Sequence, residues 1–556
     1  MDNTNISRKF AIGNRIRMKE LIRNYKGRVA WFAFASLLLF ISCYNRQGEE
    51  TAFERVVAYY ANTGDTLKMQ AAEYLCDNSR WHYGVPRSLS RLPEQPYTDF
   101  LARPEVNPDS VFQSYLDSQN IYIVIDDSVA DRDTISDDYL INDIELAFDS
   151  WHKPWAKDIS FRDFCKYILP YRNGDEALSD WRRYFKERYA TSIMDSVSDP
   201  SSLPEVAQYI MRQIRRDVAY GGSMGLFCDE LLTPEGMMQL HWMECKGCAH
   251  YTTLAMRACG VPCAMIQINW RFTEIPHYTV LFPAVGSNER AFRLTVGDTL
   301  MYMGEPKDTM AAWRVWEYDY ELNQERLQLQ QLYASTLDDF DYLFTPPTIS
   351  DVTSQMCTTY DFSLSVPDSL RKEKYLFLCR FHDWQWLPVR EGRVCDDSVR
   401  FLNTTIRQWY RLGYADGDSV KTFGNTFTLL GDKEITDINN RIRIYDLSGD
   451  TILFRLAYRD MVNDSLPRRD MTTFYWGSDN EWHKYNGHAV LWYFNPKTGE
   501  YLEHEAGLKD RGFRSDFHLL DVRLPRWTVF YDDILKSPYG FLKPDDGTGE
   551  GVLMQF

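Results

Sequence analysis

The spacing of apolar residues between positions 244 and 300 changes from helical to alternating, which predicts one helix followed by three strands. The helix is expected to present one apolar face, at positions i, i+3, i+4 and i+7, made of Tyr251, Leu254, Ala255 and Ala258. Gly260 gives a C-terminal stop signal, and Pro262 prevents the helix from continuing. The strand-like segments that follow are Cys263–Trp270, His277–Phe282 and Ala291–Val296.

The segments before this stretch also show helical spacing. Within residues 51–135, AFERVVAYYANTGDTLKMQAAEYLCDN predicts two helices separated by an Asn-Thr-Gly turn, and DSVFQSYLDS predicts a third. Ser160 is a good N-cap for FRDFCKYIL, and Pro170 ends that helix. A longer helix is expected over Leu203–Tyr220.

A polar and aromatic cluster follows the helix that Ser160 begins. We expect Arg172, Glu176 and the pair Trp181-Arg182 to form packing contacts and ion pairs, and a place in a cleft is the alternative. Three polar or aromatic residues lie just before the helix predicted in residues 244–260, and one of them is a candidate donor to an oxyanion: Gln239, His241 and Trp242.

The period changes to two after about residue 346. VWEYDYELNQERLQLQQLYAS, within residues 303–345, predicts a helical connector, and Thr345-Pro346-Pro347 marks a boundary. Beyond it, RIRIYDLSGDTILFRLAYRD and HAVLWYFNPKTGEYLEH each predict a hairpin. Several tryptophans there line either a glycan- or peptide-binding face or the core: Trp384, Trp386, Trp476, Trp482 and Trp492.

The first residues have the pattern of a targeting segment. Basic residues precede the short apolar run WFAFASLLLFIS, which is too short for a comfortable transmembrane helix. The run ends in Phe-Ile-Ser-Cys, which resembles a bacterial lipoprotein box with Cys43 as the lipidated residue. Met18 is an alternative start, and a plain anchor or ordinary signal peptide is the rival interpretation.

Composition narrows the class of protein. The chain has 556 residues, which predicts several domains, and its net charge of −17 argues against nucleic acid as a partner. Eleven cysteines are sparse for this length, so the chain is no disulfide scaffold. The patterns together predict an α+β multidomain protein, divided at residues 1–43, 44–135, 136–345, 346–435 and 436–556.

Candidate chemistry centres on Cys248, which we expect at a helix N-terminus, where the positive end of the dipole favours a thiolate. If the strands containing His277 and Val296 form a hairpin about Gly286-Ser287-Asn288, Asp298 becomes a diagonal neighbour of His277. A thiol, an imidazole and a carboxylate form a working nucleophile, base and orienter.

These motifs resemble the transglutaminase-like superfamily of papain-type cysteine enzymes. KGCAHYTTLAMRACGVP is similar to its Gly-Cys-helix-Gly-Ile-Pro pattern, and PHYTV to its histidine strand. The resemblance implies Cys248 as nucleophile, His277 as base and Asp298 as orienter. It also implies a papain-like core over residues 136–345, followed by β-sandwich modules over 346–435 and 436–556.

Three rival interpretations remain open. Cys245, Cys248, Cys259 and Cys263 have a spacing that suits a zinc site, although a helix between the two pairs would hold them roughly 15 Å apart. Cys245 and Cys248 are also a candidate redox pair. The third interpretation is a non-catalytic surface lipoprotein that binds a glycan or a protein.

We therefore expect acyl transfer from an amide by a cell-envelope lipoprotein, anchored through Cys43 to a bacterial membrane, with the outer membrane favoured. An oxyanion would be held by the Cys248 backbone N–H and one further donor. Peptides, glycoproteins or peptidoglycan stems are the expected substrates, and no metal or organic cofactor is required. Cys248 under apolar packing, with His277 pointing elsewhere, would end this enzyme proposal and leave a tethered adhesive module.

Overall fold

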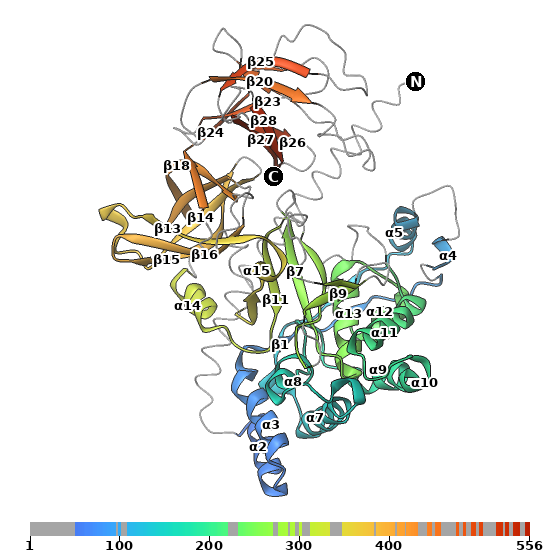
Figure 1. The fold of residues 1–556 in the computed structure, drawn as a ribbon. Helices are drawn as coiled ribbons and strands as arrows, with labels where there is room; N and C mark the ends of the chain where they lie inside the picture. The colour runs from blue at the N-terminus through green and yellow to red at the C-terminus, as the bar shows by residue number, and fades with distance from the viewer. Residues whose placement is uncertain are drawn as a thin grey trace.

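A computed structural model describes most of residues 50–431 and, beyond them, strands alone. Its gaps before residue 431 are 96–97, 102–107, 221–231, 271–275, 287–289, 295–299, 303–311, 334–346, 383–384, 406–408 and 418. The predicted leader with Met18 and Cys43 lies outside the described residues, as does Asp298. The described chain mixes helices with antiparallel sheets, as an α+β protein does (Figure 1).

Two N-terminal helices form the predicted helical hairpin. Helix α2 (Ala52–Thr63) and helix α3 (Thr66–Asn78) pack together, and Gly64 between them has φ 75°. This left-handed conformation is accessible to glycine at little cost, which explains the Asn-Thr-Gly turn. Short elements follow along the chain: η1 (Ser79–Trp81), β1 (Tyr83–Gly84), β2 (Arg87–Leu89), α4 (Thr98–Leu101), α5 (Pro108–Ser118), β3 (Ile123–Ile125), β4 (Val129–Ala130) and α6 (Asp131–Thr134).

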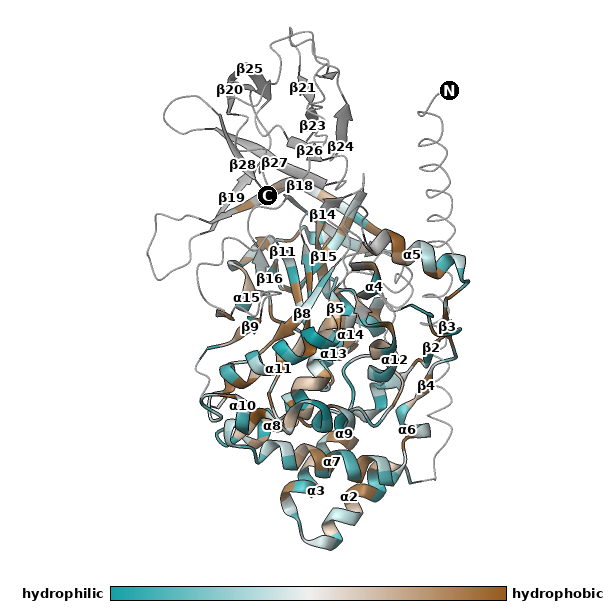
Figure 2. Ribbon diagram, turned by 90° about the vertical axis from the view of Figure 1, so that its right-hand side faces the viewer, coloured by the Kyte–Doolittle hydropathy of each residue, from teal (hydrophilic) through white to brown (hydrophobic). Residues whose placement is uncertain are grey.

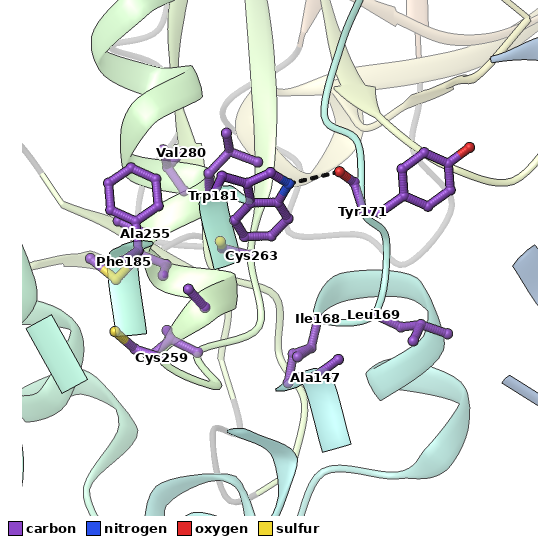
Figure 3. Packing of buried hydrophobic residues seen from close by; sticks show 14 of the residues in the cluster. Ala147, Ile168, Leu169, Tyr171, Trp181, Phe185, Ala255, Cys259, Cys263 and Val280 are labelled. Atoms are coloured by element: carbon purple, nitrogen blue, oxygen red, sulfur yellow. Dashed lines mark hydrogen bonds between the residues drawn. The ribbon is translucent and has the colours of Figure 1, made fainter. Parts of the chain in front are cut away.

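Helix α13 (Cys245–Ala258) forms the centre of the helical layer. All four residues of its predicted apolar face are buried, so that prediction is confirmed. Figure 3 shows side chains from neighbouring segments packed beside Ala255, among them Trp181, Phe185 and Val280. The helices of this layer are α7 (Asp137–Trp151), α8 (Phe161–Tyr167), α9 (Trp181–Phe185), α10 (Ile193–Ser196), α11 (Leu203–Asp217) and α12 (Pro234–Leu240), with η2 (Pro154–Ala156) and η3 (Lys186–Ala190).

Capping residues set the limits of several of these helices as the sequence predicted. The Ser160 side chain accepts a hydrogen bond from the Asp163 backbone N–H, so α8 begins where expected. Helix α11 is capped by Ser202 but ends at Asp217, and residues Ala219–Tyr220 form strand β5 beside β6 (Trp242–Met243). In Figure 2 these helices carry both hydrophilic and hydrophobic stretches, as expected of amphipathic helices.

A four-stranded antiparallel sheet packs against the helical layer in the order β12-β11-β7-β8. Its strands are β7 (Ala264–Trp270), β8 (His277–Leu281), β11 (Ala312–Tyr318) and β12 (Ile349–Asp351). The first two strands of the sequence prediction are confirmed. The helical connector is confirmed only over α14 (Gln324–Tyr333), because the apolar residues before it form β11, which is buried on both faces.

The predicted hairpin from His277 to Val296 is seen only in part, because Val296 and most of its turn lie outside the described residues. Strand β8 pairs with β7, which places His277 opposite Ile268. Among the described residues, an antiparallel bridge between Phe282 and Phe292 joins the end of β8 to the next segment. Strand β9 (Phe292–Leu294) also pairs with β10 (Leu300–Tyr302).

Residues 359–446 form one seven-stranded antiparallel sheet within the described residues, where the resemblance implied a sandwich. Strand β12, which follows the predicted boundary at residue 346, belongs to the preceding sheet, and β19, which follows residue 435, belongs to this one. The strands are β13 (Thr359–Ser365), β14 (Tyr375–His382), β15 (Gln385–Cys395), β16 (Ser398–Thr405), β17 (Trp409–Asp416), β18 (Ser419–Gly431) and β19 (Ile442–Asp446), with α15 (Thr353–Met356) and η6 (Asp368–Leu370).

One of the two C-terminal hairpins is confirmed. Strand β23 pairs with β24 through Asn495 and Glu500, as predicted, whereas β20 pairs with β25 and not with β19. The strands are β20 (Thr451–Ala457), β21 (Phe474–Trp476), β22 (Trp482–Lys484), β23 (Leu491–Asn495), β24 (Glu500–Glu503), β25 (Leu519–Pro525), β26 (Val529–Asp532), β27 (Ser537–Pro544) and β28 (Gly551–Gln555). Among the described helices, none has the length and apolar character needed to cross a membrane.

Candidate active site at the start of helix α13

Helix α13 begins at Cys245, and Cys248 lies one turn inside it. The prediction that Cys248 stands at the helix start is therefore wrong. The first turn of a helix leaves its N–H groups without intrahelical acceptors and carries the positive end of the dipole. These features act on Cys245, which is the first residue of the helix.

The thiol of Cys248 is enclosed by protein. Its Sγ lies 3.6 Å from the carbonyl oxygen of Met243. Burial, followed by the nearby Cys245 and Glu244, raises the pKa of the Cys248 thiol to about 12. Its backbone N–H donates to the Glu244 carbonyl at 2.9 Å, so that N–H is not available to the oxyanion that it was predicted to hold.

The thiol of Cys245 has a more polar environment. Its Sγ lies 3.6 Å from Oε2 of Glu244, and it also receives the backbone N–H groups of Tyr278 and Lys246. Burial first, and then the charge of Glu244, raise its pKa to about 11, while the two N–H groups oppose that shift. The thiol is thus protonated at neutral pH in this arrangement, contrary to the thiolate that the helix start predicted.

His277 is the first residue of β8, and its imidazole lies on the opposite face of the sheet from α13. Side chains alternate along a strand, and residues paired between strands share a face. Tyr278, whose ring lies 5.7 Å from Nζ of Lys246, faces the helix. His277 pairs with Ile268, which packs against α15 on the other face. Burial and the positive charge of Arg293 lower the pKa of His277, so the imidazole is neutral at pH 7.

Cys245 and His277 nevertheless come close through the backbone. The N–H that the Cys245 sulfur receives belongs to Tyr278, the residue directly after His277. The structure thus brings the start of α13 to the start of β8. It does not bring Cys248 and His277 together, and Asp298 lies outside the described residues.

Tyrosine and glutamine side chains line the sheet beside Cys245. Oε1 of Gln267 accepts hydrogen bonds from the hydroxyls of Tyr278 and Tyr318, each at 3.3 Å. Nε2 of Gln267 donates to Asn269 at 3.0 Å. These groups, with Lys246, give the helix-facing side of the sheet several hydrogen-bonding groups close to the thiol.

Buried ion pairs form in the cluster around Arg172, as the sequence predicts. Nε of Arg172 donates to Asp131 at 2.7 Å, and the indole N–H of Trp181 donates to the Tyr171 carbonyl at 2.8 Å (Figure 3). Arg182 pairs with Asp143 at 2.8 Å. The cluster of packing contacts and ion pairs is therefore confirmed.

Residue His250 connects α13 to this cluster. Its Nδ1 lies 3.1 Å from Nδ2 of Asn173, whose backbone N–H donates to the Glu176 carboxylate. An amide nitrogen only donates, so Nδ1 accepts and the imidazole carries its proton on Nε2. The loop around Asn173 is thereby held against the middle of α13.

His241, one of the candidate oxyanion donors, has a structural partner. Nδ1 of His241, the C-terminal cap of α12, lies 3.1 Å from the Asp217 carbonyl. The four cysteines of the zinc interpretation lie at opposite ends of α13. Cys259 and Cys263 are within the core in Figure 3, so the two pairs do not form one tetrahedral site.

The Gly-Cys pair at 247–248 predicts that the helix starts at Cys248, whereas α13 starts at Cys245. The spacing of the apolar face indicates the earlier helix start. Counting back three residues from Tyr251 reaches Cys248, which places this cysteine on the buried face and therefore inside the helix.

Comparison of the chain with protein-family models, with curated proteins and with solved structures gives no match.

Proposed function

We propose that the protein is a cysteine-dependent enzyme that transfers acyl groups from amides, with Cys245 as the nucleophile and His277 as the base. One observation carries the proposal. The first residue of helix α13 is a cysteine whose sulfur receives the backbone N–H of the residue directly after His277. A thiol at a helix start is a suitable nucleophile, and the neutral imidazole of His277 would become its base by turning over the end of β8 from the other face of the sheet.

The reaction would proceed in two steps. Sγ of Cys245 attacks the carbonyl carbon of an amide, while the imidazole of His277 takes the thiol proton and passes it to the leaving amine. The resulting thioester is released by water as an acid, or by a primary amine as a new amide. A neutral His277 is the form that accepts a proton, and the lowered pKa keeps it in that form.

Backbone N–H groups of the first turn would hold the oxyanion. Lys246 gives its N–H to the Cys245 sulfur, which leaves the N–H groups of Cys245 and Gly247 before the first intrahelical bond, the one that Cys248 makes to Glu244. They replace the N–H of Cys248 in this role. Asp298 stays a proposed orienter of His277, as the resemblance to transglutaminase-like enzymes implies.

The proposed setting is the cell envelope, with Cys43 as the lipid anchor and the outer membrane as the favoured site. Peptides, glycoproteins or peptidoglycan stems are the proposed substrates. These proposals depend on the sequence of the leader and on the resemblance.

Site-resolved alkylation tests the nucleophile. The full chain is treated with limiting iodoacetamide, and each cysteine is quantified by peptide mapping. Because the proposal has the His277 ring turn toward Cys245 and take its proton, Cys245 should react before the exposed Cys395, and Cys248→Ser should leave its rate unchanged. His277→Ala should slow the reaction at Cys245. Equal or slower reaction of Cys245 than Cys395 would contradict the proposal.

A non-catalytic scaffold that binds a glycan or protein is the second candidate. The placement of the His277 imidazole on the face away from α13 favours it, because catalysis requires the ring to turn over the end of β8 toward Cys245. The alkylation experiment separates the two, since a scaffold needs no dependence of Cys245 on His277.

A further inference from the structure

We propose that Cys245 and Cys248 form a redox-active pair, in which a disulfide between them closes and opens on the first turn of helix α13. The disulfide itself needs no enzymatic activity. Its consequence rests on the proposed function, because a disulfide would remove the thiol nucleophile and so switch the enzyme off.

The two cysteines have suitable backbone positions. They are three residues apart in a helix, and a rise of 1.5 Å per residue on a cylinder of 2.3 Å radius separates their Cα atoms by about 5 Å. Disulfides span Cα distances of about 4.4–6.8 Å. The Cβ atoms of such a pair are about 5–6 Å apart and must approach to about 4 Å. Cys245 is the first residue of the helix, and its N–H makes no intrahelical bond.

The two sulfurs have different surroundings, and these assign Cys245 as the attacking thiol and Cys248 as the resolving thiol. Both cysteines are free and partly exposed as residues. The sulfur of Cys245 lies among polar groups, next to Glu244 and two backbone N–H groups. The sulfur of Cys248 lies 3.6 Å from the carbonyl oxygen of Met243 and is more deeply buried than that of Cys245. Cys245 therefore meets an external reagent first, and Cys248 waits as the internal partner.

The chemistry balances with a small disulfide, RSSR, as the oxidant. The Cys245 thiolate attacks one sulfur of RSSR, which forms a mixed disulfide and releases RSH after protonation. The Cys248 thiolate then attacks Sγ of Cys245 and releases the second RSH. Two electrons and two protons pass from the cysteine pair to the reagent.

The chain offers two matched controls. Cys259 and Cys263 are a second pair of cysteines near each other in the sequence, but both are fully buried, so an external disulfide does not reach them. Cys395 is exposed and should stop at a mixed disulfide, because no cysteine of the described residues lies beside it in its strand.

The test treats the full chain with glutathione disulfide at pH 8 and follows its mass and tryptic peptides. Lys246 lies between the two cysteines, so trypsin separates them and a disulfide appears as two linked peptides that part on reduction. Wild type should show this link, with a loss of about 2 Da from the closed pair. Cys248→Ser should stop at a glutathione adduct on Cys245, and Cys245→Ser should leave Cys248 unmodified.

A stable glutathione adduct on Cys245 of the wild type, or no reaction there, would overturn the proposal. Closure of Cys259 with Cys263 under the same conditions would also overturn it, because burial would then not select the pair. These readouts are masses, so failure of the proposed acyl transfer leaves them decisive.

Discussion

Replacing Gly260 by alanine should destabilise the helical layer by about 3 kcal/mol. Gly260 has φ 79°, and an added Cβ would lie 2.2 Å from the carbonyl oxygen of Ser150 in α7. Ordinary contact begins at 3.4 Å, so the two backbones must separate by about 1.2 Å, the difference between these distances. Ser150 resists this movement because its hydroxyl donates to the Ala258 carbonyl at 2.7 Å. A left-handed backbone costs alanine about 1–2 kcal/mol, and such overpacking costs about 1–3 kcal/mol more.

Gly64→Ala is the matched control. Gly64 also follows a helix and has φ 75°, but no atom lies within 4 Å of its added Cβ. It should therefore show only the backbone cost, about 1–2 kcal/mol. Urea-dependent hydrogen exchange of peptides from α13 measures the free energy of unfolding of this layer in both variants, because α2 shares its core. Equal destabilisation by the two substitutions would refute the close approach of α13 to α7.

Two further predictions concern charge. Arg293→Gln should raise the pKa of His277, because it removes one of the two causes that lower it, and an NMR titration of the imidazole measures the shift; an unchanged pKa would place Arg293 too far away to act. Asp131→Ala should cost about 3–5 kcal/mol, because it leaves the buried Arg172 unpaired, whereas Asp137→Ala at an exposed pair should cost about 0–1 kcal/mol in the same unfolding assay. Similar costs for the two would contradict the burial of the first pair.

Local signals predicted the elements that frame the site. The apolar period of α13, its stop at Gly260 and the Ser160 cap each depend on a few neighbouring residues, and the structure confirms them. The Asn-Thr-Gly turn and the cluster around Arg172 are also confirmed.

Local signals do not predict which of two distant strands pair with each other. The alternation of residues 277–282 predicts a strand but does not say which neighbour it pairs with, and the structure pairs β8 with β7 along its whole length. The same uncertainty changed the partner of β20. Because pairing decides which face a residue occupies, the position of the His277 side chain could not be derived from its spacing.

The predicted start of α13, at Cys248, and its observed start, at Cys245, differ by three residues, and this difference changes the candidate nucleophile. Glycine at position 247 suggested a helix boundary, but the first turn of α13 includes it. Burial of Cys248 follows from its place on the apolar face. Cys245 lies where the first turn meets β8, and that meeting depends on tertiary packing rather than on the local sequence.

Acylation by p-nitrophenyl acetate tests the central claim most directly. The full chain is mixed with the ester, the burst of nitrophenolate is recorded, and the acetylated residue is located by peptide mapping. The account predicts a burst of one equivalent with acetyl on Cys245, lost in Cys245→Ser and kept in Cys248→Ser. Acetyl on Cys248, or a burst that survives in Cys245→Ser, would contradict it.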